Sequence, residues 1–160
     1  MKKDVMILTG AGQIGMAIVR RMGYGMKIVI GDKRIANAEA IATTMNNASF
    51  DCVAVATDLA SRDSILDIIA QARSYGDITM LVNAAGVSPS QVPIEAILKV
   101  DLYGTAMLLE EVGKVIAPGG SGVTISSQSG HRMPALTPEE DRLLAMTPAE
   151  ITVTSDAPAR

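Results

Sequence analysis

Aromatic side chains are almost missing from this sequence of 160 residues. Phe50, Tyr24, Tyr75 and Tyr103 are the whole set, and there is no tryptophan. The interior must therefore be filled by isoleucine, valine, leucine, alanine and the ten methionines. Apolar residues make up 48% of the chain, and this composition at this length predicts one globular domain with a substantial core.

Cysteines, long apolar runs and basic clusters are also lacking. The single cysteine, Cys52, cannot form an internal disulfide, and its apolar neighbours predict a buried hydrophobic residue and not a reactive thiol. No apolar run approaches the ~20 residues that span a bilayer, and residues 1–4 do not begin a signal peptide. The net charge of −3 includes no basic block, which argues against nucleic-acid or membrane-surface binding. We therefore expect a soluble, cytoplasmic protein.

Short apolar runs alternate with longer helical patterns along the chain. Strands are expected at 5–8, 26–30, 52–56, 78–82 and 123–126, and helices at 13–22, 35–45, 61–75 and 94–116. The strand segments are β-branched and apolar on both faces, as in a parallel sheet that helices cover on both sides. The sequence predicts an α/β fold of the Rossmann-like kind: a doubly wound parallel sheet in three layers, α/β/α.

The alternation stops after Gly130, which divides the chain into an α/β domain at 1–130 and a proline-containing tail at 131–160. Thr137, Pro138 and Glu140 have the spacing of a helix start, with an N-cap, a first-position proline and a capping-box glutamate. A short helix is expected from there to Ala145. Thr147 and the proline after it form a second such start.

A glycine-rich segment joins the first strand to the first helix. It reads Gly10, Ala11, Gly12, Gln13, Ile14, Gly15. In a Gly-x-Gly-x-x-Gly segment at this place, Gly10 allows a tight turn, Gly12 lets a pyrophosphate approach the backbone, and Gly15 lets the helix pack on the strand. The free N–H groups of the helix start would face the phosphates. The alternative is a glycine-rich turn without a ligand.

Asp32 ends the second strand, 22 residues after Gly10. A carboxylate at this place can accept hydrogen bonds from the ribose hydroxyls of adenosine, and it would repel a 2′-phosphate, which favours NAD over NADP. Lys33 and Arg34 follow directly. Either could reach a phosphate or simply be a solvated charge at the start of the next helix, so NADP remains possible.

Three further segments carry a family resemblance. They are Thr57-Asp58-Leu59, Leu81-Val82-Asn83-Ala84-Ala85-Gly86 and Thr124-Ile125-Ser126-Ser127. In order and spacing, residues 4–130 resemble the short-chain dehydrogenase/reductase family. The resemblance implies that 1–130 binds a dinucleotide, with Asp58 on the adenine amino group, Leu59 beside the ring, and Asn83 to Gly86 along the middle of the cofactor. The residues themselves leave plainer alternatives: a turn at Asp58 and close packing at 84–86.

The resemblance also implies an oxidoreductase that moves hydride between a nicotinamide cofactor and an alcohol or carbonyl. Ser127 matches the family's active-site serine, and Asp101 stands where the family usually has asparagine. The family's tyrosine and lysine, four positions apart, have no counterpart, because no tyrosine follows Tyr103 and no lysine follows Lys114. His131, the only histidine, is better explained as a loop residue. We expect a chain truncated before the catalytic helix, with no turnover of its own.

Two other hypotheses remain from the sequence. One is a dinucleotide-binding module without catalysis. The other is a scaffold that pairs through a sheet left incomplete at its C-terminal edge, because an unpaired strand invites association. The second favours a homo-oligomer. The substrate stays open, with residues 88–92 as part of one wall of its pocket.

Overall fold

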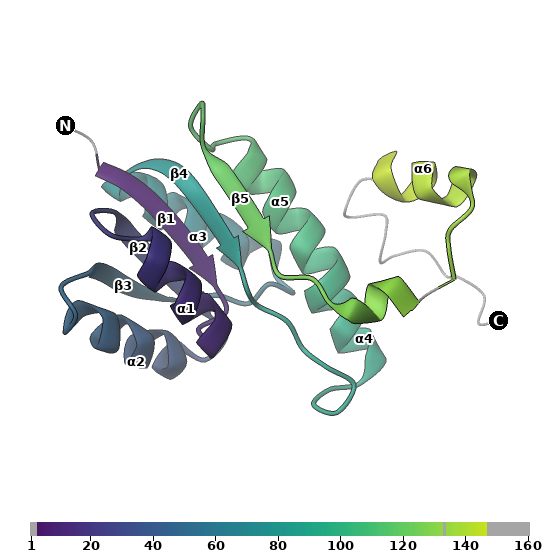
Figure 1. Ribbon diagram of the computed structural model, residues 1–160, viewed down its shortest axis with the longest axis horizontal. Helices are drawn as coiled ribbons and strands as arrows, with labels where there is room; N and C mark the ends of the chain where they lie inside the picture. Colours follow the sequence, from purple (N-terminus) through teal and green to yellow (C-terminus); the bar gives the residue numbers. More distant parts are fainter. Residues whose placement is uncertain (1–2, 133, 147–160) are drawn as a thin grey trace.

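The computed structural model describes residues 3–132 and 134–146, which form layers of helices around a parallel sheet (Figure 1). Within these residues, five strands pair in the order β3-β2-β1-β4-β5, and all neighbouring strands are parallel. The strands are β1 (Lys3–Thr9), β2 (Lys27–Asp32), β3 (Asp51–Ala56), β4 (Gly76–Asn83) and β5 (Ser121–Thr124). The predicted doubly wound sheet is confirmed.

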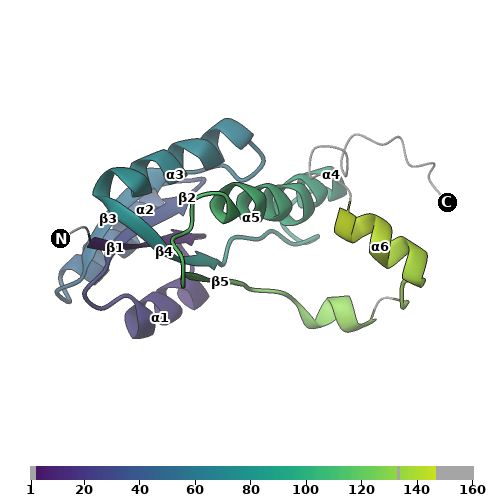
Figure 2. The ribbon, with the colours of Figure 1, turned by 90° about the horizontal axis from the view of Figure 1, so that it is seen from above.

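The helices are α1 (Gln13–Met22), α2 (Ile35–Asn46), α3 (Arg62–Tyr75), α4 (Ile94–Ile97), the π-helix η1 (Leu98–Gly104), α5 (Thr105–Gly113), the 3₁₀-helix η2 (Gln128–Arg132) and α6 (Pro138–Met146). Of these, α1, α2, α3 and α5 contribute to the cores on the two sides of the sheet, whereas η2 and α6 lie away from it (Figure 1). Seen from above, α3 and α5 lie on one side of the sheet and α1 on the other (Figure 2).

Alternate residues of β1 point to opposite faces of the sheet, and each face has its own core. Val5 and Ile7 belong to the core that includes residues of α3 and α5. Met6 and Leu8 belong to the core that includes residues of α1 and α2. All four side chains are fully buried. A strand that is apolar on both faces therefore becomes the centre of a sheet covered on both sides.

The predicted helix at 94–116 is one long stretch, whereas the structure divides it among α4, η1 and α5. At the end of η1, a Cβ on Gly104 would lie 2.5 Å from the carbonyl oxygen of Leu59. The close approach of these two backbones accounts for a glycine at this position. A π-helical turn is rare and is frequently found beside functional sites.

The predicted strand at 123–126 is two residues too late. β5 ends at Thr124, which pairs with Asn83, the last residue of β4. The strand ladder therefore ends there, and beyond it Ile125 donates its backbone N–H to the Asn83 carbonyl at 2.9 Å. On its other side β5 pairs with no strand among the described residues, so it is an edge of the sheet there.

The chain after β5 is exposed throughout residues 125–132 and 134–146. α6 has the predicted capping box: Thr137 donates its backbone N–H to Glu140 Oε2 at 2.8 Å, and Glu140 donates its own to Thr137 Oγ1 at 3.3 Å. The predicted start at Thr147 lies outside the described residues, and the division at Gly130 stays a prediction. No helix in the described parts is long and apolar enough to cross a membrane.

Candidate functional site

A cleft of about 820 Å³ opens where β1, β2, β3 and β4 end. The sheet order places β2 and β4 on either side of β1, so the chain reverses its direction of winding there. Ligands of open α/β sheets bind at such a switch point, outside the carboxyl ends of the strands. Predicted residues that line this cleft are Gly10, Ala11, Gly12, Asp32, Lys33, Asp58, Leu59, Ala84, Ala85 and Gly86.

The glycine-rich loop packs on the end of β4. Gly10 has a φ of +88°, and a Cβ there would lie 2.4 Å from the backbone nitrogen of Ala85. A Cβ on Gly15 would lie 2.8 Å from the Gly10 carbonyl oxygen. Gly12 differs, because a Cβ there would meet nothing within 4 Å. Packing within the chain therefore explains the first and third glycines but leaves the second with open space beside it.

The loop leads into α1, whose first turn has no side-chain cap. Gly12 is the N-cap residue, and its carbonyl accepts the backbone N–H of Met16. The first N–H groups of a helix have no partner inside the helix and carry a partial positive charge, so they suit an anion. Gln13 and Ile14 begin the helix with exposed side chains, and neither they nor the buried Gly15 line the cleft.

Asp32 ties the glycine-rich loop to the start of α2. Its Oδ2 accepts the backbone N–H of Ala11 at 3.0 Å. Its Oδ1 accepts the backbone N–H of Arg34 at 2.9 Å and the side-chain amide of Asn37 at 3.2 Å. The carboxylate thus lies in the cleft beside the glycine-rich loop, and its contact with a ribose stays a prediction.

Asp58 and Lys33 form an ion pair between the ends of β3 and β2, with 2.9 Å from Lys33 Nζ to Asp58 Oδ2. The other oxygen of Asp58 accepts the backbone N–H of Ala60 at 3.0 Å. Burial raises the pKa of the Asp58 carboxyl, but the hydrogen bonds from Lys33 and Ala60 outweigh it and hold this pKa below the usual value. Asp58 therefore both forms a turn and lines the cleft. Leu59 lines the cleft with a buried side chain.

Asn83 lies behind the cleft and not in it. Its side chain is fully buried; Oδ1 accepts the hydroxyl of Thr9 at 2.7 Å and Nδ2 donates to Thr105 Oγ1 at 3.3 Å. These bonds join β4 to β1 and to α5. Asn83 therefore holds the floor of the cleft together, while Ala84 to Gly86 form its surface.

The two predicted catalytic residues are not among those that line the cleft. Asp101, in η1, accepts the backbone N–H of Val87 at 3.0 Å through Oδ1, so it anchors the loop after β4. Ser127 is exposed, and its Oγ accepts the backbone N–H of Ser129 at 3.1 Å at the start of η2. The structure does not bring Ser127 among the residues that line the cleft.

Several residues of the cleft were not predicted from the sequence. They are Thr9, Gly31, Asn37, Thr57, Val87 and Val100; Gln91 and Val92 come from the wall expected at 88–92. Strand ends could have indicated Thr9, Gly31 and Thr57, because the carboxyl ends of parallel strands share one edge. Asn37 and Val100 come from helices. Only the packing of those helices brings them to the cleft.

A doubly wound parallel sheet with a glycine-rich loop at its switch point defines a dinucleotide-binding class of α/β protein. The family model for short chain dehydrogenase matches residues 4–138, and the chain belongs to this family. The family consists of oxidoreductases that bind nicotinamide cofactors.

Curated relatives and solved structures agree with this assignment. A short-chain dehydrogenase/reductase of Alternaria brassicicola is 35% identical over 133 residues, which are 83% of this chain and 48% of that protein. Galactitol 2-dehydrogenase of Agrobacterium fabrum is 28% identical over 85% of this chain and 57% of its own length. The chain thus spans about half the length of these relatives.

Among solved structures, a short-chain dehydrogenase/reductase from Serratia marcescens is 25% identical with a TM-score of 0.70, over 82% of this chain and 58% of its own. A 3-ketoacyl-(acyl-carrier-protein) reductase from Brucella melitensis, complexed with NADH, is 27% identical with a TM-score of 0.58, over 68% of this chain and 48% of its own.

Proposed function

We propose that this chain is the cofactor-binding part of an NAD(P)-dependent oxidoreductase. The observation that carries the proposal is that Gly12, the N-cap residue of α1, and Asp32 line one cleft at the switch point of the sheet. When bound there, the nicotinamide ring supplies hydride transfer to or from an alcohol or carbonyl. The likeness to a reductase complexed with NADH supports the choice of ligand.

The pyrophosphate lies in this proposal against Gly12 and the first turn of α1. The space beside Gly12 lets the phosphates approach the backbone, and the helix N–H groups donate to their oxygens. This supplies a reason for the one glycine of the loop that packing within the chain does not explain.

The adenosine half lies toward Asp32 and Asp58. The Asp32 carboxylate accepts the ribose hydroxyls while it keeps the backbone N–H of Ala11. Since a 2′-phosphate beside it would be repelled, NAD is the preferred cofactor and NADP the weaker one. In this proposal Asp58 and Leu59 lie beside the adenine ring, and Ala84 to Gly86 lie along the middle of the cofactor.

The substrate end involves Asp101 and Ser127. Asp101 positions the loop of Val87 by accepting its N–H, and Ser127 matches the family's active-site serine. These 160 residues contain no tyrosine after Tyr103 and no lysine after Lys114. We therefore expect this chain alone to bind cofactor without turnover.

The test is a calorimetric titration of the purified chain with NADH and, separately, with NADPH. We expect saturable binding, tighter for NADH. Gly12→Val should abolish binding while the fold survives, because its side chain points into open space. Gly113→Val is the matched control, since a Cβ at Gly113 also meets nothing within 4 Å but the residue is no part of the cleft. Failure of the unmodified chain to bind either dinucleotide would contradict the proposal.

A further inference from the structure

Lys33 and Asp58 face each other across two neighbouring strand ends. Asp32 pairs with Ala56 at the last position of the β2–β3 ladder, and Lys33 and Asp58 lie one and two residues beyond it. The 2.9 Å contact between Lys33 Nζ and Asp58 Oδ2 therefore closes the corner of the cleft next to Asp32.

Asp58 is the fixed member of this pair. Its Oδ1 accepts the N–H of Ala60, and its own backbone N–H donates to Ser64 Oγ at 2.9 Å, which ties the residue to α3. The Lys33 side chain is 70% exposed, against 34% for Asp58. Because the lysine stem is long and flexible, the ammonium is placed by the carboxylate and not the reverse.

The pair matters because Lys33 directly follows Asp32 in the sequence. Lys33 and Arg34 are the basic residues that line the cleft, and they directly follow the carboxylate that would hold the ribose. A 2′-phosphate on that ribose needs a cation nearby to offset Asp32. In the structure the Lys33 ammonium is instead directed to Asp58.

We propose that Asp58 sets the choice between the two dinucleotides by withholding Lys33 from a 2′-phosphate. The proposal rests on the proposed function, because it assumes that adenosine binds at this corner. Discrimination then has two parts: Asp32 repels the phosphate, and Asp58 occupies the lysine that would otherwise neutralise it. Arg34 stays available in either case.

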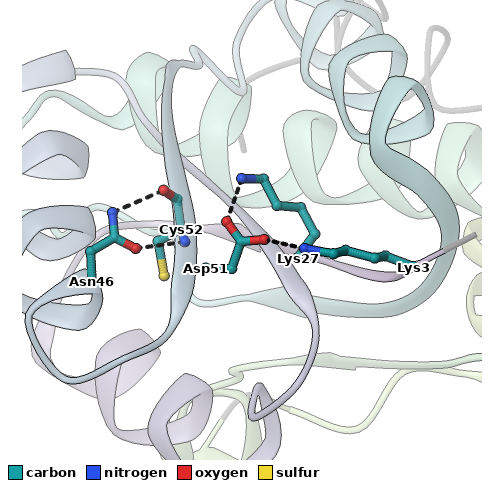
Figure 3. A network of polar contacts seen from close by, with 5 residues as sticks. All are labelled: Lys3, Lys27, Asn46, Asp51 and Cys52. Carbon is teal, nitrogen blue, oxygen red and sulfur yellow. Dashed lines mark hydrogen bonds and ion pairs between the residues drawn. The ribbon is translucent and has the colours of Figure 1, made fainter.

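The test compares Kd for NADH and NADPH in the unmodified chain, Asp58→Asn, Lys33→Met and the double variant. Both dinucleotides carry the same base, so any direct contact between Asp58 and adenine cancels in the ratio of the two constants. Asparagine keeps the Oδ1 acceptor for Ala60. Asp51→Asn is the control, because Asp51 also pairs with lysines, Lys3 and Lys27, but lies outside the cleft lining (Figure 3).

We expect Asp58→Asn to shift the ratio about two- to fivefold toward NADPH, the size of one exposed ion pair. Lys33→Met alone should change the ratio less than about twofold, the double variant should return to the original ratio, and Asp51→Asn should leave it unchanged. An Asp58→Asn shift that persists in the double variant would show general charge repulsion and overturn the proposal. So would an unchanged ratio in Asp58→Asn. If the unmodified chain binds neither dinucleotide, the proposed function itself fails and this inference with it.

Discussion

At the scale of single residues, the amino-terminal ends of the strands are joined by charge. Asp51 lies between Lys3 and Lys27, with 2.7 Å to each ammonium nitrogen. Lys27 is well buried and lies 4.7 Å from the ring centroid of Tyr75 (Figure 3). Hydrogen bonds from Lys27 and then Lys3 lower the pKa of the Asp51 carboxyl against the opposing effect of burial. One carboxylate therefore links β1, β2 and β3.

Asp51→Asn should lower the free energy of unfolding by about 0.5–1 kcal/mol at pH 7, since the pair is partly exposed and screened. The pKa of Asp51 in the folded state is depressed, so its stabilisation is complete well above the ordinary pKa of 3.8 and is lost as pH falls through and below that value. Urea unfolding at pH 7 and pH 3 measures both. An equal difference between the two proteins at both pH values would contradict this account.

The neighbouring Cys52 should be unreactive. Burial, and then the charge of Asp51, raises the pKa of its thiol to about 11. The backbone on both sides of the thiol is also held, because the Asn46 side chain bonds to the Cys52 N–H and carbonyl. Labelling with a maleimide at pH 8 should be slow in the native chain and fast in urea. Rapid labelling of the native chain would show that the thiol is exposed and ionised.

At the scale of elements, the π-helix η1 lies between α4 and α5 and contributes Val100 to the cleft. This π-helix carries Asp101 to the N–H of Val87 and ends at Gly104 against the Leu59 backbone. These two contacts set the positions of the loop after β4 and of Leu59 relative to the cleft. The π-helical conformation of η1 could not be predicted from the sequence, because the spacing of apolar residues in 94–116 is compatible with a regular α-helix.

Gly104→Ala should destabilise the fold by about 1–3 kcal/mol, because the added methyl meets the backbone of Leu59 in the turn before α3. Gly113→Ala, where a Cβ meets nothing within 4 Å, should be neutral or slightly stabilising through helix propensity. Urea unfolding compares the two variants. Equal stabilities would show that the close contact at Gly104 is relaxed without cost.

The elements that could be predicted are those set by local patterns. The bounds of α1 and the capping box of α6 follow from residues a few positions apart. The end of β5 and the cleft contribution of Asn37 depend instead on where other elements stop or pack. The glycine loop and Asp32 were predictable because both lie at strand ends, while the Lys33–Asp58 pair needed the side-chain geometry.

At the scale of the whole molecule, apolar side chains remain exposed along α4, η1 and α5. Ile94, Leu98, Leu102 and Leu109 are each at least 40% exposed, and the outer edge of β5 is unpaired within the described residues. Exposed apolar patches and free strand edges both favour association. We therefore expect a homo-oligomer.

Light scattering with size-exclusion chromatography should report a dimer or larger assembly. Leu102→Glu should shift it toward monomer, because a charge would be buried in the contact. Leu66→Glu is the matched control, an exposed leucine on α3 outside this stripe. A clean monomer for the unmodified chain would contradict the expectation.

The central claim is that the cleft at the switch point binds a nicotinamide dinucleotide. The most direct test is an NADH titration of the ¹⁵N-labelled chain, followed through its backbone amide resonances. The account predicts saturable shifts at residues 10–15, 32–34, 58–59 and 84–86, with residues 46–52 unchanged as an internal reference. Absence of shifts, or shifts confined to residues outside the cleft, would contradict it.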